Sequence, residues 1–174
     1  MSTPPATSTR TPSDVAREVF HAIFDERDLS DPSRYWTDES VDHFVALGKS
    51  GKDALAGFFR ELFAGFPDWT LEIEQTIDDG DGRVVVQWTA RATFDGAPWQ
   101  GIEPTGSKVT VRGVDVISLD PDGKVDQNTV YYDGAGFARQ IGMLPREGST
   151  ADRAVLAAFN LTTKAKERLR SRRG

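Results

Sequence analysis

The sequence predicts one α+β domain, a cone-shaped, curved antiparallel sheet packed by N-terminal helices around a central pocket. Three observations carry this prediction. Segments with helical apolar spacing precede four strand-like segments between residues 70 and 132. One of these segments, residues 83–94, is long for a strand and should bend. A bent sheet closed by helices leaves a cavity, and 174 residues suffice to bury a core around it.

The elements follow from local patterns. A helix should begin at Thr11, with Pro12 in its first turn, and continue to about residue 27. Apolar spacing predicts further helical segments at residues 51–64 and 137–143. Period-two patterns bounded by turns predict strands at 41–47, 70–77, 83–94, 108–119 and 124–132.

We divide the chain into three parts. Residues 1–10 are rich in Ser, Thr and Pro and should form a disordered tail. Residues 11–148 form the domain, and residues 149–174 form a C-terminal helix that ends in a basic tail. Six basic residues and one acidic residue give residues 161–174 a charge of +5, whereas the remaining 160 residues carry −11. The acidic body argues against a nucleic-acid partner, and the tail either contacts a membrane or nucleic acid, stays solvated, or folds back on the body.

Composition excludes several kinds of protein. The chain has no Cys and only two His, so a disulfide scaffold and a thiol nucleophile are excluded and a metal site is not expected. Nothing resembles a phosphate loop or a dinucleotide fingerprint. The N-terminus lacks the apolar core of a signal peptide, and no apolar run is long enough to span a bilayer. A cytoplasmic protein without a membrane partner is therefore expected.

Asp133 is the first candidate for chemistry. It ends the last strand and, by the two-residue period, points into the pocket mouth beside Tyr131 if Val125 points inward. A carboxylate partly removed from water has a raised pKa and can exchange protons near neutral pH. The alternative is that Asp133 only caps the following turn.

Asp115 is the second candidate, within an apolar strand and two residues after Gly113. If the strand is regular, this carboxylate enters the core and needs a partner or a function. If Gly113 marks a bulge, Asp115 turns outward. One interpretation makes Asp115 and Asp133 a catalytic pair.

Other side chains are candidates for binding. His43 shares a face with Val41 and is either a hydrogen-bonded core residue or a pocket residue. Several aromatic side chains could line either the core or a pocket for a flat, apolar or aromatic small molecule: Trp36, Phe66, Trp69, Trp88, Phe94, Trp99 and Tyr131. Outward-facing Val85, Val114 and Val116 predict a homodimer that buries them.

Four segments resemble, in order, motifs of the SnoaL-like polyketide cyclase family, which has the nuclear-transport-factor-two-like fold. They are G-F-P-D at 65–68, G-I-E-P-T-G at 101–106, D-G-K-V at 122–125 and D-G-A-G-F-A-R-Q-I-G at 133–142. The resemblance covers residues 13–146. It implies an intramolecular aldol condensation of a polyketide-type substrate, with Asp133 as general acid and base and with no metal or organic cofactor.

Two positions depart from the family pattern. Phe94 stands where many members have a His, and Thr129 stands where many have a Trp. Phe94 cannot donate a hydrogen bond to an enolate. A non-catalytic binding protein of the same fold is therefore the alternative, as are the hydroxylases, isomerases and epoxide hydrolases that the fold includes.

Overall fold

The computed structural model describes residues 10–44 and 48–171, so residues 1–9 of the expected N-terminal tail lie outside the described residues. It confirms the α+β architecture. One sheet has the strand order β2-β1-β6-β5-β4-β3, with bounds β1 Trp36–Phe44, β2 Gly48–Gly51, β3 Thr70–Asp78, β4 Arg83–Phe94, β5 Ser107–Leu119 and β6 Val125–Tyr132. The helical elements are α1 Pro12–Phe20, η1 His21–Asp25, η2 Pro32–Arg34, α2 Lys52–Gly65, α3 Gly134–Gln140 and α4 Thr150–Ser171.

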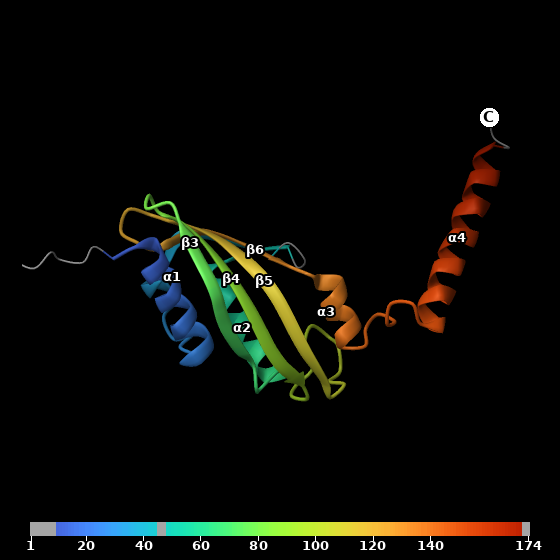
Figure 1. Cartoon of the computed structure of the whole chain (residues 1–174), viewed down its shortest axis with the longest axis horizontal. Coiled ribbons are helices and arrows are strands. Elements are labelled where there is room, and N and C mark those ends of the chain that lie inside the picture. The colour runs from blue at the N-terminus through green and yellow to red at the C-terminus, as the bar shows by residue number, and fades with distance from the viewer. Residues whose placement is uncertain (1–9, 45–47, 172–174) are drawn as a thin grey trace, which may run out of the picture.

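The strands curve as one sheet, and α1 and α2 lie against it while α4 stands clear of the body (Figure 1). Neighbouring strands are antiparallel except for β1 and β6, which run parallel. The sheet is therefore mixed rather than antiparallel throughout. The parallel pair joins β1, near the start of the chain, to β6, near the end of the domain.

The start of α1 follows its sequence signal. The Thr11 hydroxyl accepts a hydrogen bond from the Asp14 backbone N–H at 3.2 Å, and the Asp14 carboxylate accepts one from the Thr11 backbone N–H at 2.9 Å. This reciprocal pair satisfies two N–H groups that the first turn leaves free. The helix buries Val15, Val19 and Phe20 against the sheet, because these positions recur on one face.

The boundaries differ from expectation at three places. β1 begins at Trp36, five residues earlier than predicted, because the strand is irregular between Trp36 and Val41 and carries polar residues there. The short strand β2 was not predicted, and residues 45–47 of the expected first strand lie outside the described residues. α3 begins three residues early, at Gly134, since Asp133 caps it.

An irregularity in β6 determines which of its side chains face the interior. Val125 pairs with Leu119, but Gln127 pairs with Ser118, so β6 has one extra residue at Asp126. Such a bulge reverses the alternation of side chains that follows it. Val130 is consequently buried and Tyr131 is exposed.

Candidate active site

The concave side of the sheet and the helices enclose a cavity of about 100 Å³. Its lining is apolar and strongly aromatic, and only three of its residues carry a carboxyl or carboxamide group: Asp42, Asp115 and Asn128. A small-molecule site has this character, an apolar pocket with few polar groups converging on one place.

Asp115 lies inside the fold. Its side chain is 6% exposed, and both carboxylate oxygens have partners. The Trp88 indole N–H donates to Oδ1 at 2.7 Å, and the Asn128 amide Nδ2 donates to Oδ2 at 2.8 Å. These two hydrogen bonds fix the orientation of the carboxylate and compensate part of the cost of burying it.

Gly113 does not turn Asp115 outward. The pairing of β5 with β4 runs without a shift through Gly113, which lies opposite Trp88. A Cβ atom at Gly113 would lie 2.3 Å from Cζ2 of the Trp88 ring. Glycine is needed here so that the indole can cross over the neighbouring strand and reach Asp115.

Asp42 lies across β6 from Asp115. It pairs with Asn128 in the parallel β1–β6 register, and its side chain is 1% exposed. Asn128 therefore stands between two buried carboxyl groups, on the strand between theirs. The three side chains form the polar corner of the cavity.

Burial raises the pKa of both carboxyl groups in the polar corner. The pKa of Asp42 rises to about 7, chiefly because burial disfavours the charged form and further because of the negative charge on Asp115; the side-chain N–H donors of Asn128 and Trp36 near the carboxyl oppose the rise. The pKa of Asp115 rises to about 6 by burial, against the hydrogen bonds from Trp88 and Asn128. Both carboxyl groups therefore change charge much closer to neutral pH than an exposed Asp does.

Several buried polar atoms of cavity residues have no hydrogen-bond partner among the described residues. At the polar corner these are Asp42 Oδ2, Asn128 Oδ1 and the indole Nε1 of Trp36. The indole N–H groups of Trp69 and Trp99 are also without a partner in the described part of the chain. A buried N–H or oxygen without a partner is costly, so these atoms are available for water or for a ligand.

The aromatic residues expected around the pocket divide into two groups. Trp36, Trp69, Trp88 and Trp99 line the cavity. Phe66 and Phe94 do not line it; they stack on each other with ring centroids 4.7 Å apart, inside the core. A histidine in place of Phe94 would lie in that core packing, so Phe94 does not decide which donors the cavity offers.

Three further predicted site residues lie outside the cavity lining: Asp133, Tyr131 and His43. The expectation that Asp133 and Tyr131 point inward is wrong, because the bulge at Asp126 reverses their face; Tyr131 is 51% exposed, and Tyr132 lines the cavity instead. Asp133 is exposed and accepts a hydrogen bond from the Gly136 backbone N–H at 2.8 Å, as the N-cap of α3. His43 alternates with Asp42 along β1, is half-buried and does not line the cavity.

Sequence reasoning missed Asp42. Two alternating sets of positions occur in the segment around it: one set contains valines, and the other contains Asp42 and Phe44. The two-residue period of a strand alone therefore does not show which set faces inward. The inward set is Ser40, Asp42 and Phe44, all buried. One signal in the sequence favoured the correct set, because Phe44 is the largest apolar side chain of the segment and lies on the same face as Asp42.

Comparison with known proteins places this geometry in a family. The family model of the SnoaL-like polyketide cyclases matches residues 14–141, and the chain belongs to this family. It is therefore a cyclase-type member of a family that acts on small molecules. Curated protein sequences contain no match to the chain.

Solved structures agree on the fold. AclR of Streptomyces galilaeus, a proposed hydroxylase, is 21% identical over 90% of this chain and 95% of its own, with a TM-score of 0.66. A SnoaL-like protein from Jannaschia sp. CCS1, a proposed polyketide cyclase, is 24% identical over 83% and 99%, with a TM-score of 0.64. IdmH of Streptomyces antibioticus, a proposed polyketide cyclase, is 22% identical over 75% and 98%, with a TM-score of 0.63. Likeness at this identity establishes the fold alone.

Neither a metal cluster nor a membrane span is found in the described residues. Residues 10–44 and 48–171 contain no group of three His, Asp or Glu side chains placed to hold a metal ion. Within the same ranges, none of the helices combines the length and apolar character needed to cross a bilayer.

Proposed function

We propose that the protein closes a ring in a polyketide-type or other carbonyl-bearing aromatic molecule by an intramolecular aldol-type condensation, with Asp42 as general acid and base. One observation carries the proposal. The Asp42 carboxyl lies in an apolar cavity with an unpartnered oxygen, and its pKa is about 7. A proton-transfer group works best when its pKa is close to the working pH.

The reaction needs one proton to move twice. Asp42 removes a proton from a carbon beside a carbonyl, and the electron pair of the C–H bond becomes an enolate. The enolate carbon attacks a second carbonyl of the same molecule, so a C–C bond forms and an alkoxide remains. Asp42 returns its proton to the alkoxide, and the product is an isomer of the substrate. Positioned acid–base catalysis of this kind contributes about 10²–10⁴-fold.

The Trp36 indole supports the enolate in this scheme. The Trp36 indole N–H lies near the Asp42 carboxyl, and it makes no hydrogen bond of normal geometry within the described part of the chain. A buried donor next to the base can stabilise the charge that develops on the carbonyl oxygen. It replaces the donor that a His at position 94 was expected to supply.

The free indole N–H groups also indicate the substrate class. Trp69 and Trp99 line the same cavity and lack acceptors within the described chain. A ligand that satisfies them carries acceptor oxygens on an otherwise apolar, flat body, because the rest of the lining is aromatic or aliphatic. A molecule with several ring-borne or chain carbonyls has this character.

Asp115 acts as a positioning residue in this proposal. Its two hydrogen bonds hold Asn128 and Trp88, and its charge raises the pKa of Asp42. Replacing Asp115 with Asn should therefore lower the pKa of Asp42 and move the pH dependence of turnover to lower pH, which loss of packing alone would not do.

A second candidate reaction is the addition of water, as in epoxide hydrolysis. The observation that favours it is the presence of two carboxyls with different pKa values beside one amide, since one can activate water while the other donates a proton. Turnover in H₂¹⁸O separates the two reactions. Addition of water places ¹⁸O in the product and increases its mass by one water, whereas ring closure leaves the mass unchanged.

The assay for ring closure is mass spectrometry of a panel of aromatic polycarbonyl compounds, scored for isomers that differ in retention time. Asp42→Asn should bind the same compounds and lose about 10²-fold or more of turnover. Asp133→Asn is the matched control and should retain turnover, because Asn also caps helices well. If Asp42→Asn retains turnover while Asp133→Asn loses it, the assignment is refuted; tight binding without conversion across the panel favours a binding protein instead.

We also propose that the chain forms a homodimer through the outer face of the sheet. That face carries Val116 and Tyr131, both exposed, beside half-buried Val85 and Val114. Light scattering in solution tests this proposal, and a monomer at all concentrations would contradict it.

A further inference from the structure

The outer face of the sheet carries an apolar row that nothing in the described chain covers. Strand pairing places five residues side by side across it: the apolar Ile77, Val85 and Val116 on β3, β4 and β5, followed by the polar Thr129 and His43 on β6 and β1. Val114 and Tyr131 pair beside this row. Ile77, Val116 and Tyr131 are all more than a third exposed. We call this set the outer apolar row.

An acidic end adjoins the outer apolar row. The β3–β4 and β5–β6 turns lie together, since the Leu119 backbone N–H donates to the Gly82 carbonyl at 2.7 Å. These turns carry Asp78, Asp79, Asp81, Asp120 and Asp122. None of these five carboxylates forms a salt bridge within the described part of the chain.

Helix α4 has the complementary order of properties. Val155 and Phe159 are one helical turn apart and Leu156 lies beside them, and all three are more than half exposed. The C-terminal half of the helix is basic, with four positive side chains against Glu167: Lys164, Lys166, Arg168 and Arg170. Most of the stability of a helix in a protein comes from packing of its apolar face, so an exposed apolar stripe of this kind normally has a partner.

The spacing of the two surfaces matches. Lys166 and Arg170 share the helix face of Phe159, and from Phe159 the helix rises about 10 Å to Lys166 and about 16 Å to Arg170 at ~1.5 Å per residue. From Val116 to Asp120 the strand advances about 13 Å at ~3.3 Å per residue. A helix laid along β5 with Phe159 over Val116 therefore brings its basic half over the acidic turns.

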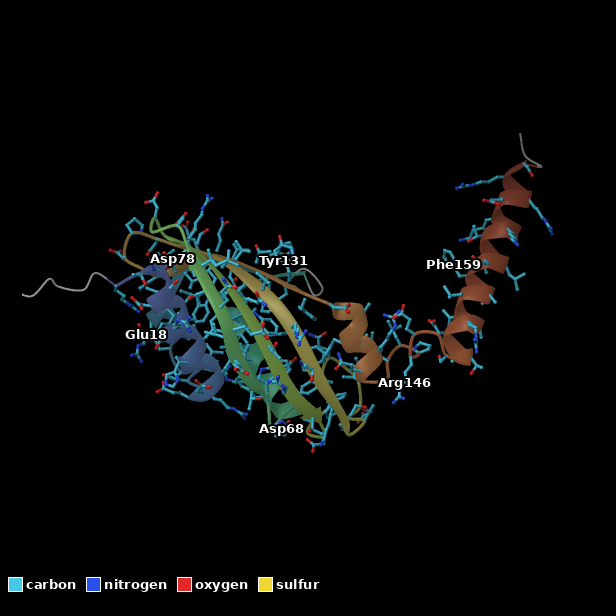
Figure 2. The ribbon with its side chains drawn as sticks, in the orientation of Figure 1. Glu18, Asp68, Asp78, Tyr131, Arg146 and Phe159 are labelled. Atoms are coloured by element: carbon cyan, nitrogen blue, oxygen red, sulfur yellow. The ribbon has the colours of Figure 1, made fainter. Side chains whose placement is uncertain are left out.

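The position of α4 indicates whose sheet it covers. Backbone hydrogen bonds from Gly142 to Arg139 and from Leu144 to Ala138 hold the connection after α3, and α4 projects beyond the body, away from its own sheet. Figure 2 shows Phe159 on this projecting helix, far from Tyr131 and Asp78 of the same chain. We propose that α4 packs on the outer apolar row of a second copy of this chain, and that the second copy returns its α4 in the same way. The proposal rests on the homodimer proposed above and specifies the contact that forms it.

Paired substitutions on α4 test the contact without disturbing the core. Phe159→Asp should raise the dimer dissociation constant by about tenfold or more, because it places a charge in the apolar stripe. Leu161→Asp is the matched control; Leu161 is 69% exposed against 64% for Phe159, but helical spacing places it on the opposite side of α4. It should leave the dimer intact. Circular dichroism checks that both variants keep their helices.

Cross-linking decides between exchange and folding back. Because the chain has no Cys, a double variant Thr163→Cys, Gln127→Cys introduces only two thiols, one on α4 and one on the outer face of β6. A short bifunctional maleimide should give a covalent dimer. An intramolecular link would overturn the proposed exchange of α4. So would a wild-type dimer that Phe159→Asp and Leu161→Asp weaken equally, although that result would still support the homodimer. A wild-type protein that is monomeric would overturn both the homodimer and the exchange of α4. A monomer that binds anionic lipid vesicles through Phe159 would do the same.

Discussion

Replacing Asp42 with Asn should stabilise the protein at high pH and not at low pH. The folded state raises the pKa of Asp42 from 3.8 to about 7, which corresponds to about 4 kcal/mol between the two protonation states. Below about pH 4 the carboxyl is protonated whether the chain is folded or unfolded, so it costs nothing. As pH rises from about 4 to 7, the carboxyl ionises in the unfolded state but stays protonated in the folded state, so the penalty develops over this range and is complete above pH 7. An amide at position 42 carries no charge and avoids it.

Urea unfolding at several pH values between 4 and 9 measures this effect. The stability of Asp42→Asn relative to the wild type should rise from near zero at pH 4 towards about 4 kcal/mol at pH 8. Asp133→Asn is the control, because it makes the same chemical change at an exposed N-cap, where no carboxyl is buried. Parallel stability curves for the wild type and Asp42→Asn would refute the reasoning that Asp42 is buried at high cost.

Three further predictions follow from the same corner. The value of kcat/KM should rise with pH, with a midpoint near 7, as Asp42 ionises. Asp115→Asn should move that midpoint to lower pH, and an unmoved midpoint would exclude the positioning role of Asp115. Trp36→Phe should lower kcat by about 10²–10³-fold with little change in unfolding free energy, and an unchanged kcat would exclude its N–H from the reaction. Gly113→Ala should destabilise by about 1–3 kcal/mol in urea unfolding, because its Cβ would meet the Trp88 ring at 2.3 Å; wild-type stability would show that the ring can move aside.

Much of the fold follows from local patterns. The long strand β4 has the predicted bounds, 83–94, because its alternation is regular and its turns contain glycine. Capping signals located the starts of α1 and α4; at α4, the Ser149 hydroxyl accepts a hydrogen bond from the Asp152 N–H at 3.1 Å. These features depend on a few neighbouring residues, which a sequence displays directly.

The site depended on strand register, which the sequence does not display. One extra residue at Asp126 reverses the face of the side chains that follow it in β6. The prediction for Asp133 counted alternate positions from Val125, before this bulge, and therefore assigned the wrong face. The parallel pairing of β1 with β6 brings Asp42 beside Asn128, although 85 residues separate them in the sequence. Only Asp115 was predictable as a buried carboxylate, since apolar residues flank it on a regular strand.

The most direct test of the account is a carboxyl ¹³C NMR titration with Asp42 assigned through the Asp42→Asn spectrum. We expect an Asp42 resonance that titrates near pH 7 and an Asp115 resonance that titrates near pH 6. An Asp42 carboxyl that titrates at its ordinary value near 4 would contradict the claim that this residue is the acid–base group of the cavity.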